Sequence, residues 1–207
     1  MGNSYGRQNR SRLMKMTTLA ILVAIVFVFQ WLGSFIHIGP TSITLVLVPI
    51  VLGGILLGPV YGAFLGLIFG IMTLWAGISG TDPFTNTLFV NQPYATSLIC
   101  LGKAVLAGWL SALIYKFIAH KNKIAAAIAA SAAAPVINTG VFILGGLFLV
   151  SETLSANFVA EGTTLVYFVI IVCAGLNFIG EFIANILLSP VIVTVTNAIA
   201  GIRKKDN

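Results

Sequence analysis

The sequence predicts an all-α integral membrane protein, and three observations support this class. The chain of 207 residues is 58% hydrophobic and has a mean hydropathy of +1.05. Charged residues make up only 8% of it, against about 25% in a soluble domain. The apolar residues gather in long runs, and about 20 residues suffice to cross a bilayer as a helix. A soluble domain of this size would expose roughly a third of its chain surface, which is incompatible with so apolar a composition.

Six apolar runs, separated by glycine, proline and polar residues, are the predicted transmembrane helices. We place them at 16–36, 43–57, 60–78, 97–118, 124–150 and 164–202. The second run is short, about 22 Å at 1.5 Å per residue. The last run is long, and we expect a kink at Pro190. Such unequal spans favour an irregular bundle with a cavity on its outer side, and we expect one transmembrane domain over 1–207.

The basic residues predict how the spans are oriented. They lie in a leader at 1–15, around the turn between the fourth and fifth runs, and in a tail at 203–207. With the N-terminus in the cytoplasm, ten of the eleven Lys and Arg residues fall inside, and Lys103 is the exception. Because cytoplasmic loops are enriched in Lys and Arg, we predict six spans with both termini inside. The net charge of +6 then belongs to the flanks of spans, and we expect no nucleic-acid partner.

Two charged side chains, Lys103 and Glu181, lie deep inside apolar runs. A charge at the centre of a bilayer costs at least about 2.5 kcal/mol, so such residues pair, line a polar cavity or bind a ligand. Asn177 and Asn185 share a helical stripe with Glu181, at spacing i, i+4 and i+8, which must face the protein interior. Two roles stay open. Lys103 pairs with Glu181, or it receives a ligand carboxylate while Asn177 or Glu181 takes the ligand's hydroxyl or amide groups.

Further polar residues are candidates for ligand contact. Phe84, Asn86 and Asn91 lie in the predicted outer loop between the third and fourth spans, where they either close over a ligand or belong to a solvated turn. Asn138 follows Pro135 in the fifth run. It either satisfies backbone groups that the proline frees or binds substrate.

Two small-residue motifs indicate close approach of helices. Gly62, Gly66 and Gly70 recur every fourth residue and line one face of the third run with backbone. We interpret this face as packing within the chain. Ala20 and Ala24 lie one turn apart in the first run, a spacing typical of internal packing or of contact with a partner helix.

These features resemble the S components of energy-coupling factor transporters. The resemblance rests on the short second span, on Leu-Gly-Pro-x-x-Gly-Ala-x-x-Gly at 57–66, and on Ala20-x-x-x-Ala24, and it covers most of the chain. S components are small six-helix membrane proteins that bind a vitamin on the outer side. The resemblance implies that Ala20 and Ala24 contact the transmembrane T component, that two partner ATPases drive uptake, and that outer loops close the pocket.

The sequence therefore predicts a substrate-binding subunit in the bacterial cell membrane rather than an enzyme. It has no Gly-x-x-x-x-Gly-Lys-Ser/Thr phosphate loop, no His-Glu-x-x-His and no Gly-x-Ser-x-Gly. Lys103 favours a small anion such as pantothenate, and the three tryptophans are more scattered than a stacking site of the thiamin or riboflavin type favours. Other vitamins (hydroxymethylpyrimidine or thiamin, folate, cobalamin and riboflavin) and a stand-alone secondary transporter stay open as alternatives. We expect no cofactor or metal, because Cys100 and Cys173 fit the role of small core residues.

Overall fold

The computed structural model describes the backbone of residues 2–34, 37–38, 41–42 and 45–205, and the side chains of 12–34, 45–175, 177–196 and 198. Within these residues most of the chain is helical, short turns join the helices, and β1 (His37–Ile38) and β2 (Thr41–Ser42) form a two-residue antiparallel pair. The predicted all-α class is confirmed. The helical elements are α1 (Gly2–Gly33), α2 (Leu47–Leu57), α3 (Pro59–Ile78), α4 (Pro83–Asn91), α5 (Pro93–Ile118), α6 (Lys123–Phe148), α7 (Ser151–Asn157), α8 (Leu165–Tyr167), the π-helix η1 (Phe168–Gly175) and α9 (Leu176–Lys205).

Five helical segments of the described chain are long and apolar enough to cross a membrane: Arg12–Gly33, Pro59–Ile78, Pro93–Ile118, Lys123–Phe148 and Leu165–Thr196. The remaining predicted span corresponds to α2, which has only 11 residues. At 1.5 Å per residue it is about 16 Å long, half the thickness of the hydrocarbon core. The sequence therefore identified the apolar segments, and α2 is shorter than predicted.

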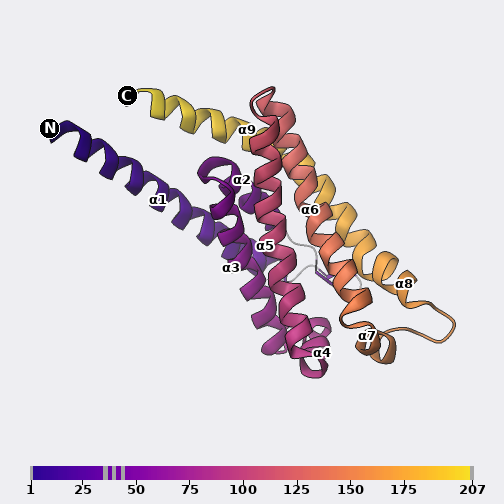
Figure 1. The fold of residues 1–207 in the computed structure, drawn as a ribbon. Coiled ribbons are helices and arrows are strands. Elements are labelled where there is room, and N and C mark those ends of the chain that lie inside the picture. The colour runs from indigo at the N-terminus through magenta and orange to yellow at the C-terminus, as the bar shows by residue number, and fades with distance from the viewer. Residues whose placement is uncertain (1, 35–36, 39–40, 43–44, 206–207) are drawn as a thin grey trace.

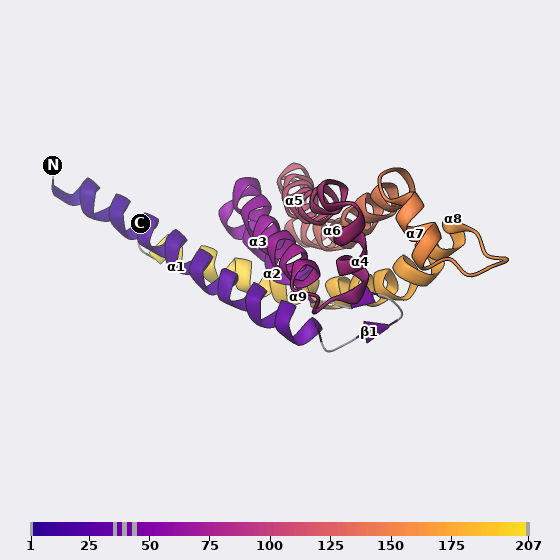
Figure 2. The same ribbon diagram turned by 90° about the horizontal axis from the view of Figure 1, so that it is seen from below.

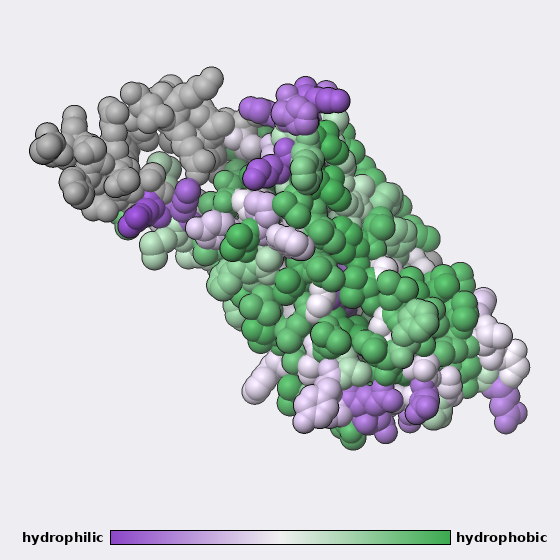
Figure 3. Space-filling view, in the orientation of Figure 1, coloured by the Kyte–Doolittle hydropathy of each residue, from purple (hydrophilic) through white to green (hydrophobic). Residues whose placement is uncertain are grey.

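The two ends of the molecule are polar and its middle is apolar. The start of α1, the end of α9 and the α5–α6 turn lie at one end, whereas α4 and α7 lie at the other (Figure 1). The space-filling view shows a broad hydrophobic belt between these ends, with polar residues over the α5–α6 turn (Figure 3). That turn exposes Lys116, Lys121 and Lys123. The first turns of α1 extend away from the other helices in both ribbon views (Figures 1 and 2).

Two short helices occupy segments that the sequence suggested were loops. α4 begins after Asp82, whose carboxylate accepts hydrogen bonds from the backbone N–H of Phe84 at 3.2 Å and of Thr85 at 3.4 Å. Pro83 at the first helical position needs no hydrogen-bond partner for its nitrogen. The Asp-Pro pair thus starts a helix rather than an open turn. α7 similarly fills part of the segment between α6 and α8.

The last apolar run is not one regular helix. A short α8 turns into η1, and α9 follows it with Pro190 inside. A π-helix has about one more residue per turn than an α-helix and occurs often at functional sites. Here the irregular segment ends just before Asn177, so it sets the rotation at which the polar stripe of α9 faces the bundle.

The glycine face of α3 packs directly on the backbone of α5. A β-carbon added at Gly66 would collide with the carbonyl oxygen of Ala104, and one at Gly70 would lie 2.8 Å from that of Cys100. Gly62 is in the same situation one turn earlier. Because these neighbours are backbone atoms, they cannot turn aside as a side chain can. This arrangement agrees with the interpretation of the glycine motif as packing within the chain.

Two apolar clusters form the core, one toward each end of the bundle. The first surrounds α2 and contains Leu22, Val26, Val46, Leu47, Ile50, Val51, Leu65, Phe69, Ala104, Ala107, Ala127, Ala130, Ala134 and Ile192. The second joins α4 and α7 to the start of the last run and contains Phe84, Leu88, Ile99, Val150, Leu154, Phe168, Val169 and Cys173. Phe69 and Phe84, one from each cluster, line the same cavity. The polar site therefore lies where the two clusters meet.

Candidate ligand-binding site

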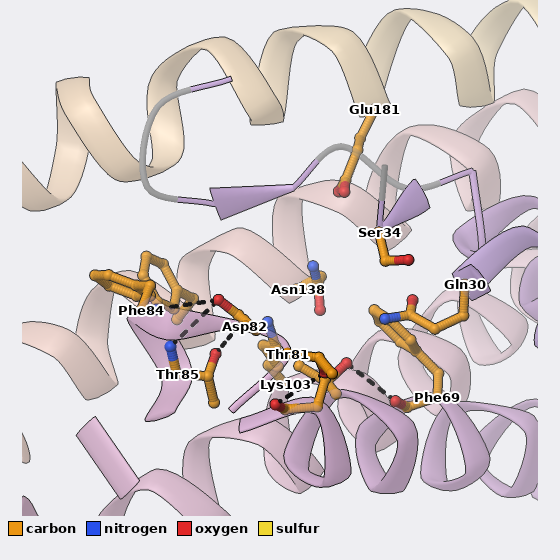
Figure 4. A pocket seen from close by; sticks show the side chains of 13 residues that line it. Gln30, Ser34, Phe69, Thr81, Asp82, Phe84, Thr85, Lys103, Asn138 and Glu181 are labelled. Carbon is orange, nitrogen blue, oxygen red and sulfur yellow. Dashed lines mark hydrogen bonds between the residues drawn. The ribbon is translucent and has the colours of Figure 1, made fainter. Parts of the chain in front are cut away.

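A cavity of about 100 Å³ lies at this junction (Figure 4). Its walls come from α1, α3, α4, α5, α6, α9 and the turn before α4, so residues far apart in the sequence converge on it. The lining residues are Gln30, Ser34, Phe69, Thr73, Ala76, Thr81, Asp82, Phe84, Thr85, Lys103, Asn138, Phe142 and Glu181.

Lys103 is the cation among the described residues of this wall. Lys103 is partly buried on α5, and its Nζ lies 5.6 Å from the centroid of the Phe142 ring. A cation over an aromatic face gains roughly 0.5–2 kcal/mol, depending on how far it is desolvated. An ammonium group has three N–H donors, which suit a carboxylate.

A smaller cavity of about 70 Å³ adjoins the first and extends it toward η1. The two share Lys103, Asn138, Phe142 and Glu181, and the smaller one adds Thr139, Cys173, Ala174 and Asn177. Four predicted site residues, Lys103, Asn138, Asn177 and Glu181, thus come together around one polar space. Asn177 and Glu181 are each 7% exposed, and the Asn177 amide donates a hydrogen bond to the Cys173 carbonyl at 3.1 Å.

The two possible partners of Lys103 both remain compatible with this arrangement. Glu181 reaches into the cavity from α9 and Lys103 from α5 (Figure 4). Whether Lys103 pairs with Glu181 or with a ligand stays a hypothesis. Asn185, the third residue of the stripe, is fully buried beyond the cavity, and its amide donates to the Glu181 backbone carbonyl at 2.8 Å.

The three candidates from the α3–α4 region lie in different surroundings. Phe84 is 5% exposed, lines the cavity, and packs on the Phe142 and Phe158 rings at centroid distances of 6.3 and 5.0 Å. Asn86 does not line either cavity: its amide donates to the Gly77 carbonyl at 2.7 Å and so ties α4 to the end of α3. Asn91 is exposed, and its amide donates to the carbonyl four residues earlier at 2.8 Å.

Several wall residues were missed by reasoning from the sequence. Gln30 on α1 is the most informative, since it is the one amide in the apolar run from Leu19 to Gly33 and could have been singled out on that ground. The Phe69 and Phe142 rings were missed because phenylalanines are frequent in apolar runs. The cavity therefore carries an aromatic lining that the scattered tryptophans did not suggest.

An open apolar groove of about 700 Å³ runs beside the cavity, between α1 and α3. Phe27, Trp31, Ile71 and Trp75 line it and are well exposed. Gln30 lines both the groove and the cavity, so it belongs to the wall that divides them. On the same helix, Ala20 and Ala24 are exposed, as a surface for another helix requires.

Comparison with known proteins identifies the family of this chain. Residues 14–202 match the model of the family described as ECF transporter, substrate-specific component. The chain is also 30% identical, over 154 residues, to the pantothenic acid transporter PanT of Lactococcus lactis subsp. cremoris, covering 68% of this chain and 75% of that protein. Members of the family are substrate-binding membrane subunits without enzymatic activity, and they associate with a T component and ATPases. The chain therefore belongs to the substrate-specific components of energy-coupling factor transporters.

Proposed function

We propose that this chain captures pantothenate outside the cell for an energy-coupling factor importer. The observation that carries the proposal is Lys103, a cation lining a cavity deep in an apolar bundle, in a chain 30% identical to a pantothenic acid transporter. Its ammonium group would receive the vitamin's carboxylate, and Asn138, Asn177 and Glu181 would face its amide and hydroxyl groups. Phe84 would cover the ligand from α4.

The size of the cavity supports a movement on binding. At about 100 Å³ it is smaller than the roughly 300–1,000 Å³ of most small-molecule sites. A vitamin would occupy both cavities by displacing the side chains they share. α4 and the turn before it are the wall elements nearest the end of the bundle, and outward movement of Phe84 would admit the ligand. Asn86 and Asn91 would then act at the edge of this gate.

A binding measurement tests the proposed ligand. Purified protein in detergent is expected to bind pantothenate by isothermal titration calorimetry, with a Kd in the micromolar range or below, and to release pantothenate in mass spectrometry of denatured samples. Thiamin and riboflavin serve as controls for the aromatic alternative, which Phe69, Phe84 and Phe142 in the wall favour. Binding of either in place of pantothenate would overturn the proposed ligand and leave the transport role intact.

The proposed topology has six spans with both termini in the cytoplasm. It is supported by the basic residues at the α5–α6 turn and at the chain ends, which lie at one end of the bundle (Figure 1). In intact cells we expect Glu161→Cys to react with a membrane-impermeant maleimide and Lys121→Cys to react only after lysis. Both positions are exposed, and the two natural cysteines are buried. Labelling of Lys121→Cys from outside would contradict this orientation.

Ala20 and Ala24 are proposed to dock the T component. The double variant Ala20→Leu/Ala24→Leu would fill the shallow groove that a partner helix needs. It is expected to lose co-purification with the T component and ATP-driven uptake, while its pantothenate Kd stays unchanged. Ala125→Leu, at an exposed alanine of α6, is the matched control. Uptake by the double variant at the normal rate, or by purified chain alone in liposomes without ATP, would instead favour a stand-alone transporter.

A further inference from the structure

The polar wall of the larger cavity combines the Lys103 ammonium with several hydrogen-bond acceptors. Four hydroxyl groups among the described residues line it, and each donates a hydrogen bond within the protein. Those of Ser34, Thr73 and Thr81 donate to backbone carbonyls at 2.6, 3.1 and 3.2 Å. The hydroxyl of Thr85 donates to the Asp82 carboxylate at 2.6 Å. A hydroxyl whose proton is committed has only its lone pairs left for a ligand.

Two amide oxygens in the same wall, Gln30 Oε1 and Asn138 Oδ1, are buried without a hydrogen-bond partner among the described residues. They come from α1 and α6, and Asn138 is 7% exposed. A buried acceptor left unpaired costs about 1–3 kcal/mol. The side chain of Gln30 extends from α1 toward the centre of the cavity, with Asn138 across from it (Figure 4). Both residues line one polar space, and a ligand that brings donors would satisfy these two oxygens.

We propose that Gln30 is a specificity-determining residue of the binding site, and that it accepts a hydrogen bond from a hydroxyl or amide N–H group of the ligand. This inference rests on the proposed function and narrows its ligand class. The ligand carries one carboxylate, for Lys103, and several O–H or N–H donors, for Gln30, Asn138 and the committed hydroxyls. Pantothenate, with one carboxylate, two hydroxyls and one amide N–H, has this composition. An apolar carboxylate such as a short fatty acid does not.

The assignment also explains why a polar residue stands on α1. Gln30 lies among apolar residues. Removing its amide from water without a compensating hydrogen bond costs free energy. Its neighbours on α1 either pack in the core, as Val26 does, or line the lateral groove, as Trp31 does. A donor on the ligand is the partner that the geometry offers to Gln30 Oε1.

The test uses two ligands and three variants in isothermal titration calorimetry. The ligands are pantothenate and its analogue in which both hydroxyl groups are replaced by hydrogen. Gln30→Met keeps the length of the side chain and removes the amide. Gln92→Met is the matched control, because Gln92 Oε1 is also buried and unpaired but does not line either cavity. Gln30→Glu keeps acceptor oxygens at the same reach.

We expect wild-type protein and Gln92→Met to prefer pantothenate to the analogue by about tenfold or more, the value of one or two hydrogen bonds. Gln30→Met is expected to bind pantothenate about tenfold more weakly and the analogue almost normally, so that the preference collapses. Gln30→Glu weakens both ligands through its charge but retains the preference.

Wild-type affinity of Gln30→Met for pantothenate, or an equal loss for both ligands, would overturn the inference. If Gln30→Met does not fold, loss of the preference in Gln30→Glu overturns it as well. Failure of the wild-type protein to bind pantothenate would overturn the proposed ligand, and the inference with it. Normal binding by Gln30→Met overturns the role of Gln30 alone.

Discussion

Replacing Lys103 by methionine is expected to abolish high-affinity pantothenate binding. The substitution keeps the aliphatic length of the side chain and removes its charge. Truncating one partner of a buried, hydrogen-bonded charge pair costs about 2–5 kcal/mol, because the other charge is left without compensation. A loss of about 3 kcal/mol corresponds to a Kd raised roughly 100-fold. Titration calorimetry on the purified variant measures this directly.

Lys116→Met is the matched control for this variant. Lys116 lies on the same helix, α5, but is exposed at the end near the α5–α6 turn. Its substitution is expected to leave the Kd for pantothenate unchanged. A wild-type Kd for Lys103→Met would show that another group binds the carboxylate of the ligand, and would contradict the proposed role of Lys103.

Thermal unfolding without ligand separates the two roles of Lys103. If Lys103 and Glu181 form an ion pair, each single substitution leaves a charge in the apolar bundle and lowers Tm, and Lys103→Met/Glu181→Gln restores part of the loss. If Lys103 serves only the ligand, the double variant is no more stable than the additive prediction. Both roles hold together if Lys103 changes partner on binding, in which case Tm and Kd respond together.

Gly66→Ala is expected to destabilise the bundle more than any other single methyl group added to α3. The new β-carbon would collide with the Ala104 carbonyl oxygen of α5, and a backbone atom can be relieved only by moving the whole helix. Overpacking of this kind costs about 1–3 kcal/mol, more than the roughly 1 kcal/mol by which alanine exceeds glycine in helix propensity. A fall in Tm of several degrees, followed by aggregation in size-exclusion chromatography, is the expected result.

Gly102→Ala provides the comparison within the neighbouring helix. A β-carbon at Gly102 meets no atom within 4 Å, so only the gain in helix propensity remains. We expect its Tm to equal or exceed that of the wild-type protein. Equal Tm values for Gly66→Ala and Gly102→Ala would mean that the α3–α5 contact is looser than its backbone distances indicate.

The site residues that can be recognised in the sequence are charged or amide residues, whose side chains are energetically costly to place in lipid. Lys103, Glu181 and Asn177 are charged or amide residues in apolar runs, and the structure gathers them around one polar space. Asn138 joins them for the same reason. Gln30 is also an amide residue in an apolar run. It has no second amide or charged residue in that run, so it forms no polar stripe like that of α9.

Other site features had no signal in the sequence. Phe84, Asn86 and Asn91 belong to the same polar segment, but of the three only Phe84 lines the cavity. α4 turns one face inward, and the Asn86 amide donates its hydrogen bond to the end of α3. The sequence suggested a loop there because an Asp-Pro pair starts turns and helices alike. The helix was decided by the Asp82 cap and by burial of Phe84 and Leu88 in the second apolar cluster.

The membrane class, the apolar segments, the glycine face of α3 and the family can all be predicted from the amino-acid sequence. These properties follow from composition and from periodicity within one helix, which need no knowledge of neighbours. Three features of the site depend on the folded bundle: which polar residues meet, that the hydroxyl groups of the wall donate within the protein, and that Gln30 lies across the cavity from Asn138. Helix rotation and the π-helical segment before Asn177 set these contacts, and both depend on packing between distant segments.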